Sequence, residues 1–178
     1  MGLFDRLLNK PTKPSITRRA LPGHPGRMTA HQAWALIAPV AEGLDAHAGL
    51  ILITSGLDID HKGFSRTWEF IFFLPKRNAT LMLSVEPDPE DADIDKAQCI
   101  LTQRIHTASS VDAKRPVFPC PFRDSPEVVA EFSAKGVDFV AGPNDMKLEG
   151  RVLPSGSAVW VTYYWDQEYS TLFEEAGS

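Results

Sequence analysis

The sequence predicts an α+β protein built from two tandem units, each a helix followed by an antiparallel sheet. Apolar residues recur at spacings of three and four from residue 30 to residue 44, which is typical of a helix with one buried face. Strand-like runs separated by turn residues follow, and the same order of elements returns after residue 125. With 178 residues, 43% of them hydrophobic, the chain is long enough to bury such a core.

The first unit is expected to cover residues 29–87. Thr29 is the predicted N-cap of its helix, because its hydroxyl can accept an otherwise unpaired backbone N–H. Pro39 should kink or end this helix, since proline removes a helix hydrogen bond. Three strands are predicted after the helix, at Leu50–Thr54, Thr67–Leu74 and Thr80–Val85.

The second unit is expected to cover residues 125–178. Ser125 should cap its helix, and Pro126 should occupy the first helical position. Residues 88–124, which separate the two units, are expected to form an acidic linker and connecting segment. The strands of the second unit are predicted at Asp145–Leu153, Ala158–Trp165 and Glu168–Phe173.

Residues 1–28 are expected to form a short N-terminal helix and an extended basic arm. The helix would carry an apolar face that docks on the domain itself or makes a weak peripheral contact with a membrane. No apolar run approaches the ~20 residues of a membrane span. No signal peptide is apparent either, so we expect a cytoplasmic protein. The residues of the apolar face are Leu3, Phe4, Leu7 and Leu8.

The charge of the chain is unevenly distributed. Residues 1–28 hold six basic residues and one acid, so the remainder of the chain carries a net charge of −10. Binding to phosphates needs a concentrated basic surface. The composition therefore argues against nucleic acid as a partner.

One stretch of the sequence resembles a known family. Ala33-Trp34 and Pro39-Val40-Ala41-Glu42 on the predicted helix, with Thr67-Trp68-Glu69-Phe70 and Ala79–Val85 on predicted strands, carry the resemblance. In these positions the run from His31 to Pro87 resembles the PepSY-type unit of bacterial proteins, a small helix packed on a cystatin-like antiparallel sheet. A weaker second copy would run from Ser125 to Glu174. The resemblance implies a protein that binds or inhibits another protein, and it supplies no catalytic residue.

An acidic segment offers a possible ion site. Asp58, Asp60, Gly63 and Glu69 match part of a calcium-binding loop. Lys62 places a cation among the expected ligands and the flanks resemble strands, so a solvated hairpin turn is the preferred interpretation.

Other catalytic patterns are weak. Cys120 lies between prolines, without the adjacent histidine that a nucleophilic cysteine needs. We expect no catalytic residue, no metal and no cofactor. Whether Cys99 and Cys120 pair is left open.

The aromatic residues of the predicted strands suggest binding. Between Val159 and Trp165 large apolar residues fall on both strand faces, whereas a sheet with one wet face should alternate apolar with polar residues. One face should meet the unit's helix, and the other should meet the sister unit, a second copy of the chain or a ligand. The leading hypothesis is a non-catalytic interaction or regulatory protein that binds a protein partner through an aromatic sheet face, with inhibition of that partner as one form of regulation. The alternative is a module that binds a small molecule or metal ion in the cleft between the units. The candidate binding residues are Trp160, Tyr164 and Tyr169.

Overall fold

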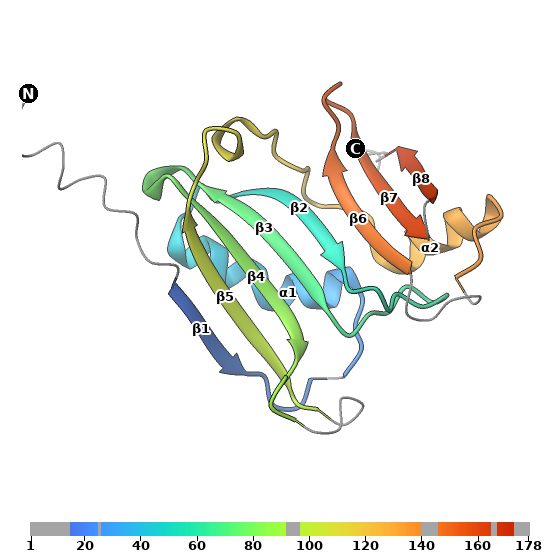
Figure 1. Ribbon diagram of the computed structural model, residues 1–178, viewed down its shortest axis with the longest axis horizontal. Helices are drawn as coiled ribbons and strands as arrows, with labels where there is room; N and C mark the ends of the chain where they lie inside the picture. The colour runs from blue at the N-terminus through green and yellow to red at the C-terminus, as the bar shows by residue number, and fades with distance from the viewer. Residues whose placement is uncertain (1–14, 25, 92–96, 140–145, 165–166, 173–178) are drawn as a thin grey trace, which may run out of the picture.

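The described part of the chain forms one antiparallel sheet of eight strands, with two α-helices packed on one of its faces (Figure 1). The computed structural model describes residues 15–24, 26–91, 97–139, 146–164 and 167–172. Across the sheet the strands lie in the order β1-β5-β4-β3-β2-β6-β7-β8. Their bounds are β1 Ser15–Ala20, β2 Gly49–Ser55, β3 Trp68–Leu74, β4 Ala79–Pro87, β5 Cys99–Thr107, β6 Met146–Val152, β7 Ala158–Tyr164 and β8 Gln167–Leu172. The helices are α1 Ala30–Leu44 and α2 Ser125–Ala134, and two short 3-10 turns, η1 and η2, span Pro75–Arg77 and Asp112–Lys114.

The prediction of two tandem helix-plus-sheet units is wrong, because the strands of both halves belong to a single sheet. Strand β2 pairs with β6 through Leu52↔Arg151, Ile53↔Gly150 and Thr54↔Glu149. The second half therefore extends the sheet of the first half sideways and does not cover its free face. In each half a helix is followed by the three predicted strands, but the edge-to-edge pairing between the halves is a long-range contact that a local pattern does not encode.

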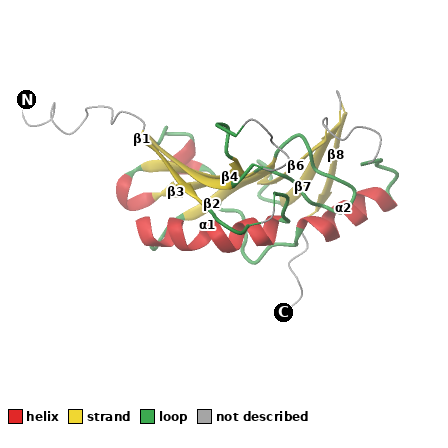
Figure 2. Cartoon of the chain, turned by 90° about the horizontal axis from the view of Figure 1, so that it is seen from below, coloured by secondary structure: helices red, strands yellow, loops and turns green. Residues whose placement is uncertain are grey.

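Both helices lie on the same side of the sheet (Figure 2). Strand β3 alternates strictly, with Trp68, Phe70 and Phe72 buried in the core and Glu69 and Ile71 only half-buried. The buried set continues into β4 and β2, and the apolar side of α2 joins the same core. The opposite side, on which neither α1 nor α2 lies and which we call the helix-free face, carries Leu52 on β2 and Arg151 on β6, as the ladder registers require.

The segment between β5 and α2, residues 108–124, links the two halves; we call it the connector. Its backbone reaches the start of β2, where the Phe118 N–H donates to the Leu50 carbonyl at 2.6 Å. Phe118 and Phe122, which we call the aromatic wedge, are buried in the core. Phe122 packs edge-on against Trp34 of α1 at 5.6 Å between ring centroids, and both wedge rings pack edge-on against Trp160 of β7.

The N-termini of the two helices share their capping groups. Thr29 caps α1 as predicted, since its side chain accepts from the Gln32 N–H. The N-cap of α2 is Asp124 and not the predicted Ser125, and the Asp124 carboxylate accepts at 2.9 Å from the His31 N–H of α1. The Ser125 hydroxyl is fully buried, where it accepts from the Ala30 N–H at 2.9 Å and donates to the Gly63 carbonyl at 2.7 Å.

Local patterns predicted six of the strands to within two residues of their bounds. Strand β1 lies in the expected extended arm, and β5 lies in the expected acidic connecting segment. Helix α1 continues through Pro39 to Leu44, so this proline does not end it. The apolar N-terminal face predicted at residues 3–8 lies outside the described residues. Within the described part of the chain, no helix is long and apolar enough to cross a membrane.

We predict that Gly63→Ala destabilises the fold by about 3 kcal/mol. Gly63 has φ +79°, and an added Cβ would come within 2.5 Å of the Pro126 nitrogen at the start of α2. The matched control is Gly156→Ala, because Gly156 has φ +90° but open space around it. The control should lose only about 1 kcal/mol, from backbone strain alone. Urea denaturation of both variants measures the difference, and equal losses would contradict the close contact between the two segments.

Candidate functional site

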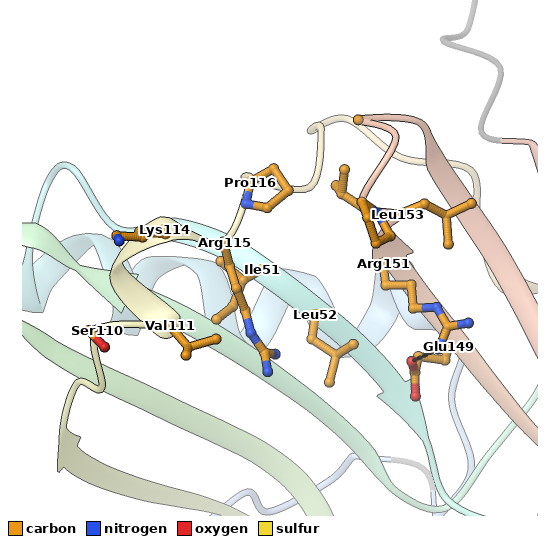
Figure 3. A pocket seen from close by; sticks show the side chains of 13 residues that line it. Ile51, Leu52, Ser110, Val111, Lys114, Arg115, Pro116, Glu149, Arg151 and Leu153 are labelled. Atoms are coloured by element: carbon orange, nitrogen blue, oxygen red, sulfur yellow. Dashed lines mark hydrogen bonds and ion pairs between the residues drawn. The ribbon is translucent and has the colours of Figure 1, made fainter.

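A groove of about 950 Å³ opens on the helix-free face where the two halves of the sheet meet (Figure 3). Ile51 and Leu52 of β2 form its apolar floor, beside Glu149 and Arg151 of β6. One wall is the connector between Ser110 and Pro116, and the other is the β6–β7 hairpin from Val152 to Gly156. The volume lies within the ~300–1,000 Å³ range of ligand sites in proteins.

A β-bulge in β2 shapes the floor. Leu50 pairs with Phe72 and Leu52 pairs with Ile71, so Ile51 has no partner in this ladder. A bulge of this kind changes the direction of the side chains around it. Here it allows two consecutive apolar residues, Ile51 and Leu52, to line the same groove.

The connector wall is held by its own short-range hydrogen bonds. The Asp112 carboxylate accepts from both the backbone N–H and the hydroxyl of Ser109, at 3.1 and 2.7 Å. The hydroxyl bond from Ser109 is the main reason that the pKa of Asp112 lies below its usual range. Arg115 lies 3.7 Å from the same carboxylate, and Val111 projects from this wall with 62% of its surface exposed.

The β6 side of the groove carries an ion-pair network around Glu149, which is only 9% exposed. Its carboxylate lies 3.2 Å from the Lys147 ammonium and 3.3 Å from the Arg151 guanidinium. Arg151 also donates to the Tyr163 hydroxyl and pairs with Glu168 at 2.9 Å. The buried carboxylate is thus compensated by two cations, which is what a charge at this depth requires.

The three candidate binding residues lie in different environments. Trp160 is fully buried in the core against the aromatic wedge, so it presents no surface to a partner. Tyr169 of β8 is 37% exposed and lies away from the groove lining. The side chain of Tyr164 lies outside the described residues. A role for Tyr164 or Tyr169 in binding stays a prediction.

The two aspartates of the alternative ion site already contact other groups of the same chain. Asp58 accepts from the Ser65 hydroxyl at 2.6 Å and lies 3.5 Å from the Arg27 guanidinium. Asp60 accepts from the backbone N–H groups of Lys62 and Phe64 at 2.9 and 3.0 Å, as an Asx-type turn does. Among the described residues, no three His, Cys, Asp or Glu side chains come together as a metal site would need.

A second, smaller pocket of about 350 Å³ lies on the helix side, between α1 and the connector. Trp34, Leu50 and Phe72 line it together with Cys120. Cys120 is a free thiol that is exposed at the edge of this pocket, and its partial loss of water contacts raises its pKa to about 11. This cysteine is therefore protonated at neutral pH and is a poor nucleophile.

The groove residues were not among those predicted from the sequence. The continuous apolar run Leu50-Ile51-Leu52-Ile53 was a usable signal, because a strand with one wet face should alternate. The basic pair Lys114-Arg115 was a second signal, since it interrupts an acidic body. The β2 run and the basic pair line one groove with β6 only because β2 pairs with β6, and neither signal predicts that pairing.

We predict that Glu69→Gln stabilises the protein at neutral pH. Glu69 lies on the helix-free face, where burial raises its pKa although Arg104 and Lys147 act in the opposite direction. The folded state then binds the proton more tightly than the unfolded state does. Stability therefore falls as pH rises from the ordinary glutamate pKa through the raised one, and the penalty persists above it.

Urea denaturation between pH 4 and pH 7.5 tests this expectation. The variant should match the wild type at the acidic end and exceed it at neutral pH. Glu42→Gln, on the exposed side of α1, controls for the loss of one negative charge. A Glu69→Gln variant that is less stable at pH 7.5 would show that its carboxylate stabilises the fold.

We predict that Cys120 reacts with iodoacetamide about 100-fold more slowly at pH 7.4 than an unperturbed cysteine. The reason is the pKa of about 11, which leaves little thiolate. Peptide mass spectrometry after timed quenching measures the rate, and the chain unfolded in urea is the control. Equal rates in the folded and unfolded chain would show that folding does not raise the pKa of this thiol.

Comparisons with other proteins give no indication of function. The resemblance of residues 31–87 to PepSY-type units stays a prediction. No protein-family model, no curated protein and no solved structure matches this chain.

Proposed function

We propose that this chain is a non-catalytic binding protein that holds a segment of a protein partner in the groove on its helix-free face. The observation that carries the proposal is the apolar floor of Ile51 and Leu52, set between two loop walls in a volume of about 950 Å³. The bulge in β2 supports the same interpretation, because bulges are frequent beside functional sites. The proposed binding surface is therefore not the aromatic sheet face that was expected from the sequence. It lies on the opposite side of the sheet.

An extended polypeptide suits the groove better than a compact small molecule. Figure 3 shows the groove open between the connector and the β6–β7 hairpin, with Val111 and Leu153 on opposite walls. Small-molecule sites enclose most of their ligand's surface. Extended segments are instead held in open grooves, where alternate side chains enter apolar contacts.

The charged groups around the groove support binding without catalysis. Glu149 is compensated by Lys147 and Arg151, and Asp112 is engaged with Ser109. A general acid or base must instead reach the reacting group and exchange a proton with it. A segment held here is withheld from its other contacts, so binding would regulate or inhibit the partner.

We predict that Val111→Ser weakens peptide binding about fivefold, because the variant loses roughly 1 kcal/mol of apolar contact. Val117→Ser is the matched control. Both valines lie on the connector with similar exposure, 62% and 60%, but only Val111 lines the groove.

The measurement is a titration of the methyl-labelled full chain, followed by NMR. The titrants are eight-residue peptides in which leucine alternates with glutamate, glutamine or lysine. At least one peptide should shift the methyl signals of Ile51, Leu52 and Leu153. If no peptide of this panel shifts these methyls at millimolar concentration, the proposed function is wrong.

A further inference from the structure

The charges on the groove identify the kind of segment it would hold. Resting on the proposed function, we infer that the groove selects an extended acidic segment in which carboxylate side chains alternate with apolar ones. The inference depends on where positive charge lies in a chain whose net charge is −5.

Among the described residues, three of the four charged side chains that line the groove are basic: Lys114, Arg115 and Arg151. Lys114 is exposed on the connector, and no carboxylate among the described residues pairs with it. Arg115 is half-exposed, and its contact with Asp112 is long, at 3.7 Å. Such a surface pair is weak, so the Arg115 guanidinium remains available to a ligand.

The one acidic residue of the lining does not cancel this charge. Glu149 is buried to 9% exposure and is already paired with Lys147 and Arg151. An arriving carboxylate would therefore meet the cations of the connector rim before it met Glu149.

The geometry separates the apolar contacts from the charged ones. Figure 3 shows Arg115 extending from the connector into the groove beside Leu52, with Arg151 and Glu149 on the other side of Leu52. Successive side chains of an extended segment point in opposite directions. Leucine-like side chains can thus rest on Ile51 and Leu52, while the intervening carboxylates reach Lys114 and Arg115 at the rim.

Nucleic acid is the other polyanion that such a rim could attract. Binding to nucleic acid uses many phosphate contacts and a broad basic surface. Here two rim cations stand in a protein of net charge −5, beside an apolar floor. Those features favour an acidic peptide.

Fluorescence anisotropy with the full chain tests the inference. The probe is a fluorescein-labelled peptide of four glutamate-leucine repeats, compared with the glutamine-leucine and lysine-leucine versions. We expect the acidic probe to bind at least about tenfold more tightly than the glutamine version. Its affinity should fall as salt is raised from 50 to 300 mM, because exposed charges are screened.

The decisive variant is Lys114→Glu combined with Arg115→Glu, which should weaken the acidic probe about 30-fold or more. Lys62→Glu combined with Arg77→Glu is the matched control, since both residues are exposed, neither lines the groove and the net charge changes equally. The control should bind like the wild type. Urea denaturation of both double variants verifies that they fold.

The outcomes separate this inference from the proposed function. If the glutamine and glutamate probes bind the groove equally, or both double variants weaken binding alike, the inference is overturned and the groove still binds peptide. Tighter binding of a labelled oligothymidine, lost in the Lys114→Glu, Arg115→Glu variant, would also overturn it. If no probe binds the groove, the proposed function itself is wrong.

Discussion

The structure depends on the pairing of β2 with β6, which joins its two halves into one sheet. Only three residue pairs join β2 to β6, and the main hydrophobic cluster lies on the helix side of the resulting sheet. The aromatic wedge strengthens this short ladder, because Phe118 and Phe122 bring Trp34 of the first half and Trp160 of the second into one packed cluster. The buried Ser125 hydroxyl adds a polar link between the start of α1 and the Gly63 loop.

The same joint positions the groove. The connector starts on the helix-free face, forms a wall there with Val111 and Arg115, and then enters the core with Phe118. Its passage past the start of β2 coincides with the bulge at Ile51. Core packing and groove shape are therefore determined by one stretch of chain, and the wall is anchored at the end where it meets the wedge.

Local patterns predicted most elements, but they did not predict how those elements pair. The Thr29 cap is a property of neighbouring residues, and it was identified from the sequence. Strand β1 was missed because prolines and glycines flank it, and β5 because an acidic stretch precedes it. The groove needs Leu52, Arg115 and Arg151 to meet, which depends on contacts up to 100 residues apart in the chain. Trp160 was expected to bind a partner because an aromatic strand residue in a core and one on a binding surface share the same local pattern.

The two helices pack on one face of the sheet, so residues on the two faces have different roles. Side chains beneath the sheet hold the fold, while those of the groove rim, such as Val111, Lys114 and Arg115, contribute little to the core. Substitutions at exposed positions of this kind change stability only slightly. The rim can therefore diversify, in evolution or in the laboratory, at small cost to folding, and the chain offers a scaffold on which new recognition could be selected without rebuilding its interior.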